Sequence, residues 1–118
     1  MRTIVAGSRG INRYDIVERA IHSSGFVITE LVSGTAQGVD TLGEQWARAN
    51  LIPVARFPAN WRKQGRAAGK IRNSKMSHYA DALIAIWDGQ SRGTKDMIDK
   101  ARYRGLRVYI VMVDSNDL

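Results

Sequence analysis

Glycine, hydroxyl and arginine residues gather in four short segments whose chemistry suits a phosphate group. The segments span residues 7–10, 33–40, 58–68 and 88–94. Glycine lets the backbone approach a ligand closely and adopt positive φ angles. Hydroxyl groups donate hydrogen bonds, and arginine forms paired hydrogen bonds with phosphate oxygens. If the fold brings these segments together, they predict an anion-binding site.

The apolar pattern of the chain predicts alternating short strands and helices that would position these segments. Expected strands span residues 3–6, 27–32, 52–57, 82–87 and 107–113, and expected helices span residues 14–24, 39–50, 69–80 and 94–103. Strict alternation with short connections predicts a parallel five-stranded sheet covered by helices on both faces. We therefore expect a Rossmann-like three-layer α/β/α sandwich. The favoured strand order is 3-2-1-4-5, and the flavodoxin-like order 2-1-3-4-5 is the alternative.

Each of the four segments follows an expected strand. The carboxyl ends of parallel strands share one edge of the sheet, and ligands bind beyond that edge. The helix that follows a segment offers unpaired N–H groups and the positive end of its dipole to an anion. The alternative is that the glycines only make tight turns and that Ser91 and Thr94 only cap a helix. We favour a phosphate site because the pattern recurs on one edge.

The candidate ligand-binding residues come mainly from these segments. They are Gly7, Ser8, Arg9, Ser33, Gly34, Thr35, Gly38, Asp40, Trp61, Asp88, Gly89, Ser91, Arg92, Gly93 and Thr94. Trp61 lies in a basic loop, where it would either stack on a base or anchor the loop. Asp40 and Asp88 would bind ribose hydroxyls or act as a base, although Asp40 would also suit the first turn of a helix.

Positive charge is concentrated in one stretch of the chain. The net charge is +7, and between Glu44 and Asp81 there are eight basic residues and no acidic residue. Such a field attracts the phosphates of a nucleotide, a nucleic acid or a lipid headgroup. The alternative is a solvated basic face that keeps the protein soluble.

Composition narrows the class of protein. The 118 residues are 44% hydrophobic and 25% charged, which is typical of one globular domain, expected here over residues 1–118. The chain has no cysteine, and its two histidines are too few for a typical histidine-rich site, so we expect neither a metal nor a cofactor. No apolar run approaches the ~20 residues that span a bilayer, and no secretory signal is evident. We therefore expect a cytoplasmic protein without membrane partners.

Six short motifs and one methionine follow one another along the chain in an order that is typical of a known protein family. They are residues 6–9, 32–40, 57–61, 67–73, Met76, 80–85 and 87–94. Together they resemble the YspA, cpYpsA-related branch of the SLOG superfamily over nearly the whole chain. The superfamily includes single-strand DNA-binding proteins, nucleotide phosphoribohydrolases and sensor domains for nucleotide-derived signals. The resemblance implies a Rossmann-like fold, with a phosphate site built from the second and fourth loops.

The resemblance also bears on catalysis. The phosphoribohydrolases carry a Pro-Gly-Gly-x-Gly-Thr-x-x-Glu motif after the fourth strand; Gly93 and Thr94 match its Gly-Thr, but Met97 occupies the position of the catalytic Glu. Arg72 matches the catalytic arginine of the preceding helix, and Asn73 follows it in the motif. Both are also expected to bind the ligand, Arg72 by neutralising its charge. Glycosidic cleavage needs a carboxylate. If the protein is an enzyme, the catalytic pair is expected to be Arg72 and Asp88.

Three functions remain open from the sequence. The first is a module that senses or sequesters a nucleotide or a nucleotide-derived, ADP-ribose-like ligand. The second is a nucleotide N-glycosidase or phosphoribohydrolase that uses Asp88 or Asp40 as its carboxylate. The third is single-strand nucleic-acid binding along residues 56–75. The resemblance also implies a homodimer or a higher homo-oligomer.

Overall fold

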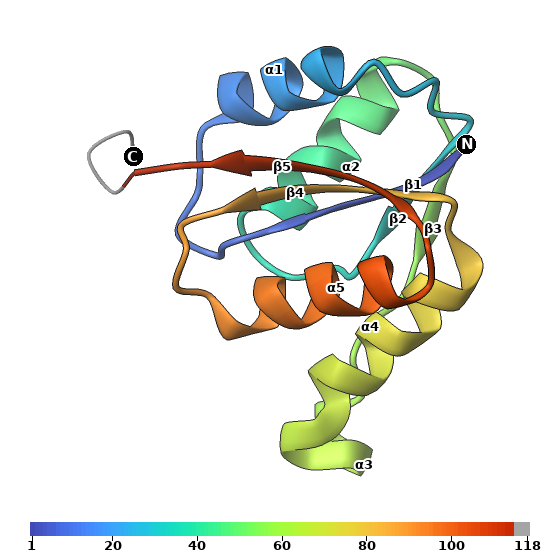
Figure 1. Ribbon diagram of the computed structural model, residues 1–118, viewed down its shortest axis with the longest axis vertical. Helices are drawn as coiled ribbons and strands as arrows, with labels where there is room; N and C mark the ends of the chain where they lie inside the picture. Colours follow the sequence, from blue (N-terminus) through green and yellow to red (C-terminus); the bar gives the residue numbers. More distant parts are fainter. Residues whose placement is uncertain (115–118) are drawn as a thin grey trace.

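The computed structural model describes residues 1–114, in which five parallel strands form one sheet in the order β3-β2-β1-β4-β5 (Figure 1). The strands are β1 (Arg2–Gly7), β2 (Glu30–Ser33), β3 (Val54–Arg56), β4 (Ala82–Trp87) and β5 (Arg107–Met112). The helices are α1 (Tyr14–Ser24), α2 (Val39–Ala49), α3 (Trp61–Gln64), α4 (Ala68–Tyr79) and α5 (Arg92–Tyr103), and η1 (Gly65–Ala67) is a 3₁₀ turn. The predicted class and strand order are confirmed, and the flavodoxin-like alternative is wrong.

The sheet is buried between two helical layers. Figure 1 shows α1 and α2 on one face of the sheet, and α4 and α5 on the other. Side chains of β4 alternate between the two cores: Ile84 and Ile86 pack with α1 and α2, whereas Leu83 and Ala85 pack with α4 and α5. This explains why the strand reads as a continuous apolar run. Within residues 1–114, no helix is long and apolar enough to cross a membrane.

The parallel pairing of the strands brings their carboxyl ends to one edge of the sheet. At the end of β1, Gly7 pairs with Ile86 of β4, and at the end of β2, Ser33 pairs with Arg56 of β3. The loops that follow β1, β2, β3 and β4 therefore start side by side. This is the edge at which the sequence predicts a ligand.

Two expected strands are shorter than predicted. Residues 27–29 are not part of β2, and Val27 is 74% exposed. The amino terminus of Met1 donates a hydrogen bond to the Val27 carbonyl at 2.8 Å, so this stretch is fixed to the start of β1 instead. The third strand begins only after Pro53, which has no N–H to pair. Its expected position at the sheet edge is confirmed.

Residues 58–68 were expected to form a loop, and this prediction is wrong because the segment contains α3 and η1. The Asn60 side chain caps α3 by accepting the Lys63 N–H at 3.1 Å. Neither α3 nor η1 has a buried residue, so no apolar periodicity marks them in the sequence. In Figure 1 this segment projects beyond the body of the fold at the start of α4.

Candidate functional site

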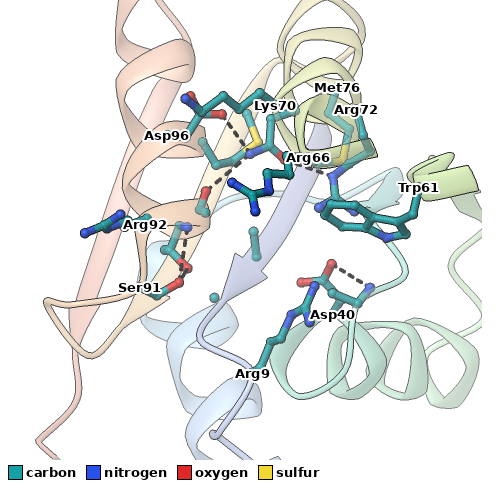
Figure 2. Close-up of a pocket in the computed structure, with 18 residues that line it drawn as sticks. Arg9, Asp40, Trp61, Arg66, Lys70, Arg72, Met76, Ser91, Arg92 and Asp96 are labelled. Atoms are coloured by element: carbon teal, nitrogen blue, oxygen red, sulfur yellow. Dashed lines mark hydrogen bonds between the residues drawn. The ribbon is translucent and has the colours of Figure 1, made fainter. Parts of the chain in front are cut away.

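A pocket of about 240 Å³ lies beyond the carboxyl end of β1, between α4 and the first turn of α5 (Figure 2). Ten residues predicted from the sequence line it, namely Gly7, Arg9, Asp40, Trp61, Arg72, Asn73, Ser91, Arg92, Gly93 and Thr94. The remaining lining residues are Ala6, Ala36, Arg66, Gly69, Lys70, Met76, Asp96 and Met97. The pocket thus draws on the loops after β1, β2, β3 and β4 and on α4.

The lining carries an excess of positive charge. Five of its side chains are cationic and two are carboxylates; these are Arg9, Arg66, Lys70, Arg72 and Arg92, against Asp40 and Asp96. In Figure 2 the Arg66 guanidinium reaches toward the middle of the pocket from η1. A concave site with such a surplus concentrates anions.

Arg72 on α4 links the helix to the loop after β2. Its Nη1 donates a hydrogen bond to the Gly34 carbonyl, and its Nε donates to Asn73 Oδ1 at 2.9 Å. Burial lowers the pKa of the Arg72 guanidinium and the nearby Asp40 carboxylate raises it. The group remains a cation at neutral pH because its ordinary pKa is far higher. Its charge is held in place at the wall of the pocket.

Asp40 places a buried carboxyl group on the same wall. The side chain lies in the first turn of α2, the residue is 5% exposed, and Oδ2 accepts the Ala36 N–H at 3.1 Å. Burial raises the pKa of Asp40 to about 6, against the lowering effects of the Ala36 hydrogen bond, Arg72 and Arg9. Glu44 on the same helix raises the pKa further. The group therefore titrates close to physiological pH.

The burial of Asp40 predicts a pH-dependent stability. A carboxyl group with a raised folded-state pKa stabilises the fold below its unfolded-state value, and this contribution is lost as the pH rises to about 6. Relative to Asp40→Asn, the wild-type free energy of unfolding is expected to fall by roughly 2–3 kcal/mol between a pH of about 4 and about 6. Urea denaturation of both proteins across this range measures the difference. Parallel curves would contradict the assignment.

The first turn of α5 forms the opposite wall. Ser91 is the N-cap, and its Oγ accepts the Thr94 N–H at 3.3 Å. The Ser91 carbonyl accepts the indole N–H of Trp87 at 3.0 Å, which ties the cap to the end of β4. A helix N-terminus leaves its first N–H groups without intrahelical partners. Because Ser91 Oγ accepts that of Thr94, the groups of this turn left for an anion are those of Arg92 and Gly93, two residues that line the pocket. The capping role and the anion-binding role of this turn are therefore compatible.

Asp88 and Gly89 lie outside the pocket lining. Asp88 Oδ1 accepts the N–H groups of Gln90 and Ser91, each at 2.8 Å, and these bonds lower the pKa of the carboxyl group. Gly89 has a φ of 81°, which the turn requires. The two residues shape the loop that leads into α5.

The predicted residues of the loop after β2, apart from Asp40, also lie behind the lining. A Cβ on Gly38 would lie 2.6 Å from the Arg9 carbonyl oxygen, so only glycine lets the loops after β1 and β2 pack together. Gly34 is less confined, because a Cβ there would meet the ends of two side chains, at 2.7 Å from Arg72 Nη1 and 2.9 Å from Asp40 Oδ2. Thr35 adopts a φ of 64° between them. These residues build the wall without lining the pocket.

Two of the predicted residues, Ser8 and Ser33, are buried and hold neighbouring loops and helices together. Ser33 Oγ donates to the Glu44 carboxylate at 2.6 Å and accepts the Thr35 N–H at 3.1 Å. Ser8 Oγ accepts the Asp88 N–H at 3.2 Å, which joins the loops after β1 and β4. Both hydroxyl groups therefore form hydrogen bonds within the protein.

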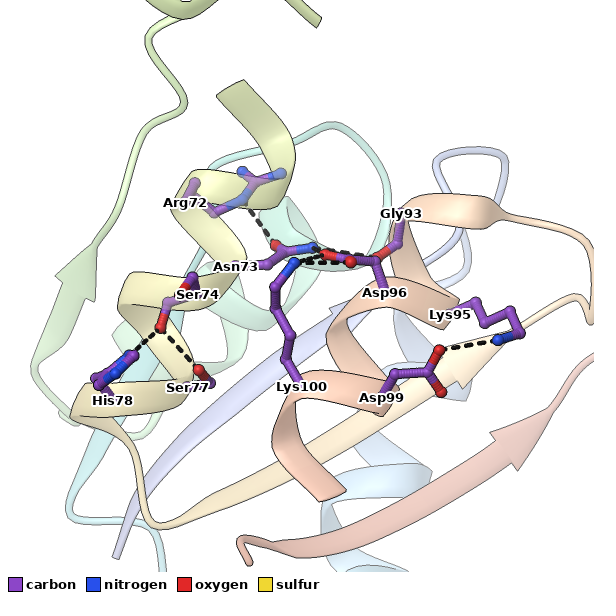
Figure 3. Close-up of polar contacts among 10 residues, drawn as sticks. All are labelled: Arg72, Asn73, Ser74, Ser77, His78, Gly93, Lys95, Asp96, Asp99 and Lys100. Atoms are coloured by element: carbon purple, nitrogen blue, oxygen red, sulfur yellow. Dashed lines mark hydrogen bonds and ion pairs between the residues drawn. The ribbon is translucent and has the colours of Figure 1, made fainter. Parts of the chain in front are cut away.

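Asn73 joins α4 to α5 at the back of the pocket (Figure 3). Its Nδ2 donates to the Gly93 carbonyl at 3.2 Å and to Asp96 Oδ2 at 3.0 Å. Lys100 Nζ in turn contacts both Asp96 oxygens at 2.7 Å. This network fixes the distance between the two helices, and with it the width of the pocket.

Eight lining residues were not among the sequence predictions. Arg66, Gly69 and Lys70 share the spacing of one helical face with the predicted Asn73, but Arg66 fell in a segment expected to be a loop, so the face could not be traced back to it. The Trp61 ring packs over this face: a Cβ on Gly69 would lie 3.3 Å from its Cη2 atom. Trp61 is still 50% exposed, so this contact covers it only in part.

Met97 lies at the base of the pocket and is 1% exposed. A methionine side chain offers only an apolar surface at the position where the resemblance to the phosphoribohydrolases implies a catalytic carboxylate. The carboxylates of the lining are instead Asp40 and Asp96. Among residues 1–114, no three His, Cys, Asp or Glu side chains are placed to hold a metal ion.

The doubly wound parallel sheet, with a cationic pocket at its carboxyl edge, defines a Rossmann-like α/β protein. The sequence model of the YspA, cpYpsA-related SLOG family matches residues 1–64, and the chain belongs to this family. No curated protein and no solved structure matches the chain. The matched range includes the loops after β1 and β2, whereas α4 and α5 lie beyond it.

Proposed function

We propose that the pocket binds a nucleotide or a nucleotide-derived ligand and that the protein senses or sequesters this ligand. The observation that carries the proposal is the convergence of five cationic side chains and the first turn of α5 on one pocket. Arg72 and Arg9 would neutralise phosphate charge from one side. The N–H groups of Arg92 and Gly93, in the first turn of α5, would bind phosphate oxygens from the other.

The remaining lining suits the rest of a nucleotide. The exposed part of the Trp61 ring offers a stacking surface for a base. The Asp96 carboxylate would accept hydrogen bonds from ribose hydroxyls. The pocket also has an apolar base formed by Met76 and Met97. A few polar groups on an apolar base are typical of small-molecule sites.

A thermal-shift panel at fixed salt tests the proposal. The panel contains AMP, ADP, ADP-ribose, cyclic ADP-ribose, NAD and a short single strand, and each nucleotide is recovered and analysed afterwards. A ligand at about 100 times its dissociation constant stabilises by about 2.7 kcal/mol, which raises the melting temperature by several degrees. A shift with intact nucleotide supports a binding module. The absence of a shift with every nucleotide would contradict the proposal.

The same panel separates binding from hydrolysis. Recovery of a free base and a sugar phosphate would establish an N-glycosidase, with Asp40 as the carboxylate nearest to Arg72 in the lining. The buried Met97 provides no group for proton transfer or for stabilising a cationic transition state. We therefore favour the binding module.

Substitution of Asp88 tests its place in the site. Asp88→Asn is expected to change nucleotide affinity by no more than about threefold, because an amide oxygen still accepts the N–H groups of Gln90 and Ser91. Asp88→Ala is expected to weaken binding by about tenfold, because the loop before α5 loses both bonds. Isothermal titration calorimetry measures both. Complete loss of binding in Asp88→Asn would instead place the carboxylate against the ligand.

A second groove favours single-strand nucleic-acid binding as the alternative function. It has a volume of about 290 Å³ and is lined by Arg56, Lys63, Lys75 and Arg72, with no acidic residue in its lining. Arg72 lines both the groove and the pocket, so one polyanion would reach the two sites. Nucleic-acid binding of this kind weakens steeply with salt. Anisotropy of a labelled single strand that does not change with salt would contradict this alternative.

A further inference from the structure

Asp40 is set between two cationic side chains that it does not neutralise directly. Within the part of the chain that the structure describes, neither Arg9 nor Arg72 forms an ion pair with it at 4.0 Å or less. The Arg72 Nη1 instead donates to the Gly34 carbonyl. A Cβ on Gly34 would lie 2.7 Å from this nitrogen and 2.9 Å from Asp40 Oδ2, so the ends of both side chains lie beside Gly34. The carboxylate is thus close to the site where these arginines would hold an anion.

The charged groups that face Asp40 come from three elements. Arg72 belongs to α4, Arg9 belongs to the loop after β1, and Glu44 lies one turn further along α2. Figure 2 shows the Arg9 side chain extending beside Asp40 at the mouth of the pocket. The other carboxylate of the lining, Asp96, is held by Lys100 on α5. Of the two lining carboxylates, Asp40 is the one whose pKa both Arg9 and Arg72 lower.

We propose that the pocket takes up its anionic ligand together with a proton on Asp40, so that affinity increases as the pH falls. This inference rests on the proposed function of the pocket. An anion held by Arg9 and Arg72 brings negative charge beside a buried carboxylate, and like charges favour the protonated form of the carboxyl group. A protonated carboxyl group also gains an O–H that can donate to a phosphate oxygen.

The pH window follows from the burial of Asp40. In the free protein its pKa is about 6, and a bound anion raises that pKa further. Affinity is then constant below about 6, decreases as the pH rises, and becomes constant again once the bound form is ionised. His22 and His78 do not line the pocket. Histidine titration within the lining therefore does not produce this dependence.

Calorimetric titration with ADP-ribose tests the proposal. Each phosphate of this probe carries one sugar ester and shares the anhydride oxygen, so it has only one, strongly acidic, ionisation. The charge of the probe is therefore constant over the range used, unlike that of AMP. At constant ionic strength, wild-type affinity is expected to be about tenfold higher at a pH of about 5.5 than at about 8. Asp40→Asn is expected to bind with the same affinity at both values. Asp99→Asn, which removes an exposed carboxylate outside the lining, should keep the wild-type dependence.

The outcomes separate the two proposals. Binding of ADP-ribose with equal affinity at both pH values would overturn proton uptake and leave the binding function intact. Absence of binding at every pH would overturn both. If Asp40→Asn does not fold, titration of the wild type at a pH of about 6.5 in two buffers of different ionisation enthalpy decides the matter. Proton uptake upon binding is expected, and zero uptake would overturn the proposal.

Discussion

Replacement of Arg72 by alanine is expected to weaken nucleotide binding by about 100-fold. The guanidinium is a half-buried cation of the pocket wall, and it also fixes the loop after β2 through the Gly34 carbonyl. Removal therefore takes away a charged hydrogen-bond donor to phosphate and loosens the neighbouring wall. Charged hydrogen bonds of this kind contribute about 1.5–3 kcal/mol, which corresponds to roughly 10- to 100-fold in affinity. Calorimetric titration with ADP-ribose measures the loss.

Two further variants sharpen this test. Arg72→Lys keeps the charge but loses the planar fork, so an intermediate loss of about tenfold is expected. Arg102→Ala removes an exposed arginine near the end of α5, outside the lining, and should leave affinity unchanged. Wild-type affinity in Arg72→Ala would show that the ligand is held elsewhere.

Gly7→Ala is expected to destabilise the fold by about 3 kcal/mol or more. A Cβ at this position would lie 2.2 Å from the Ile86 carbonyl oxygen and 2.7 Å from Val39 Cγ2. The Ile86 carbonyl also accepts the Ser8 N–H at 3.1 Å, so it cannot move without breaking the junction of β1 and β4. The close approach brings the start of α2 against the sheet edge and thereby positions the pocket.

Gly10→Ala is the matched control for this prediction. Gly10 lies three residues further along the same loop, and a Cβ there would meet no atom within 4 Å. Its free energy of unfolding is expected to stay within about 0.5 kcal/mol of wild type. Urea denaturation of both variants measures the difference. Equal stability of the two would contradict the packing at Gly7.

The sequence predicted the sheet more completely than the site, for physical reasons. Strand β4 is buried on both faces, so its apolar run marks it without ambiguity. Alternation predicted the parallel sheet but left two strand orders open, of which the favoured order 3-2-1-4-5 is the one observed. By contrast, α3 and η1 bury no side chain, and their helical turns depend on the Asn60 cap. Apolar periodicity cannot show such a segment.

Residue type alone did not show which of the predicted residues line the pocket and which form hydrogen bonds behind it. Ser33 and Ser91 are both hydroxyl residues at the carboxyl edge, yet Ser33 bonds to buried Glu44 and only Ser91 lines the pocket. The direction of a side chain depends on tertiary packing, which composition and spacing do not specify. Arg72 and Asn73, in contrast, were identified from the family-like motif, and both line the pocket.

The most direct test of the binding site is amide chemical-shift mapping of the 13.1 kDa protein during titration with ADP-ribose. The account predicts the largest shifts at lining residues from separate elements, namely Ala36, Asp40, Gly69, Asn73, Gly93 and Thr94. The turns at the opposite edge, at Gly25, Asn50 and Gly105, should not shift. Shifts confined to the groove around Arg56, Lys63 and Lys75, or no shifts at saturating ligand, would contradict the assignment of the pocket.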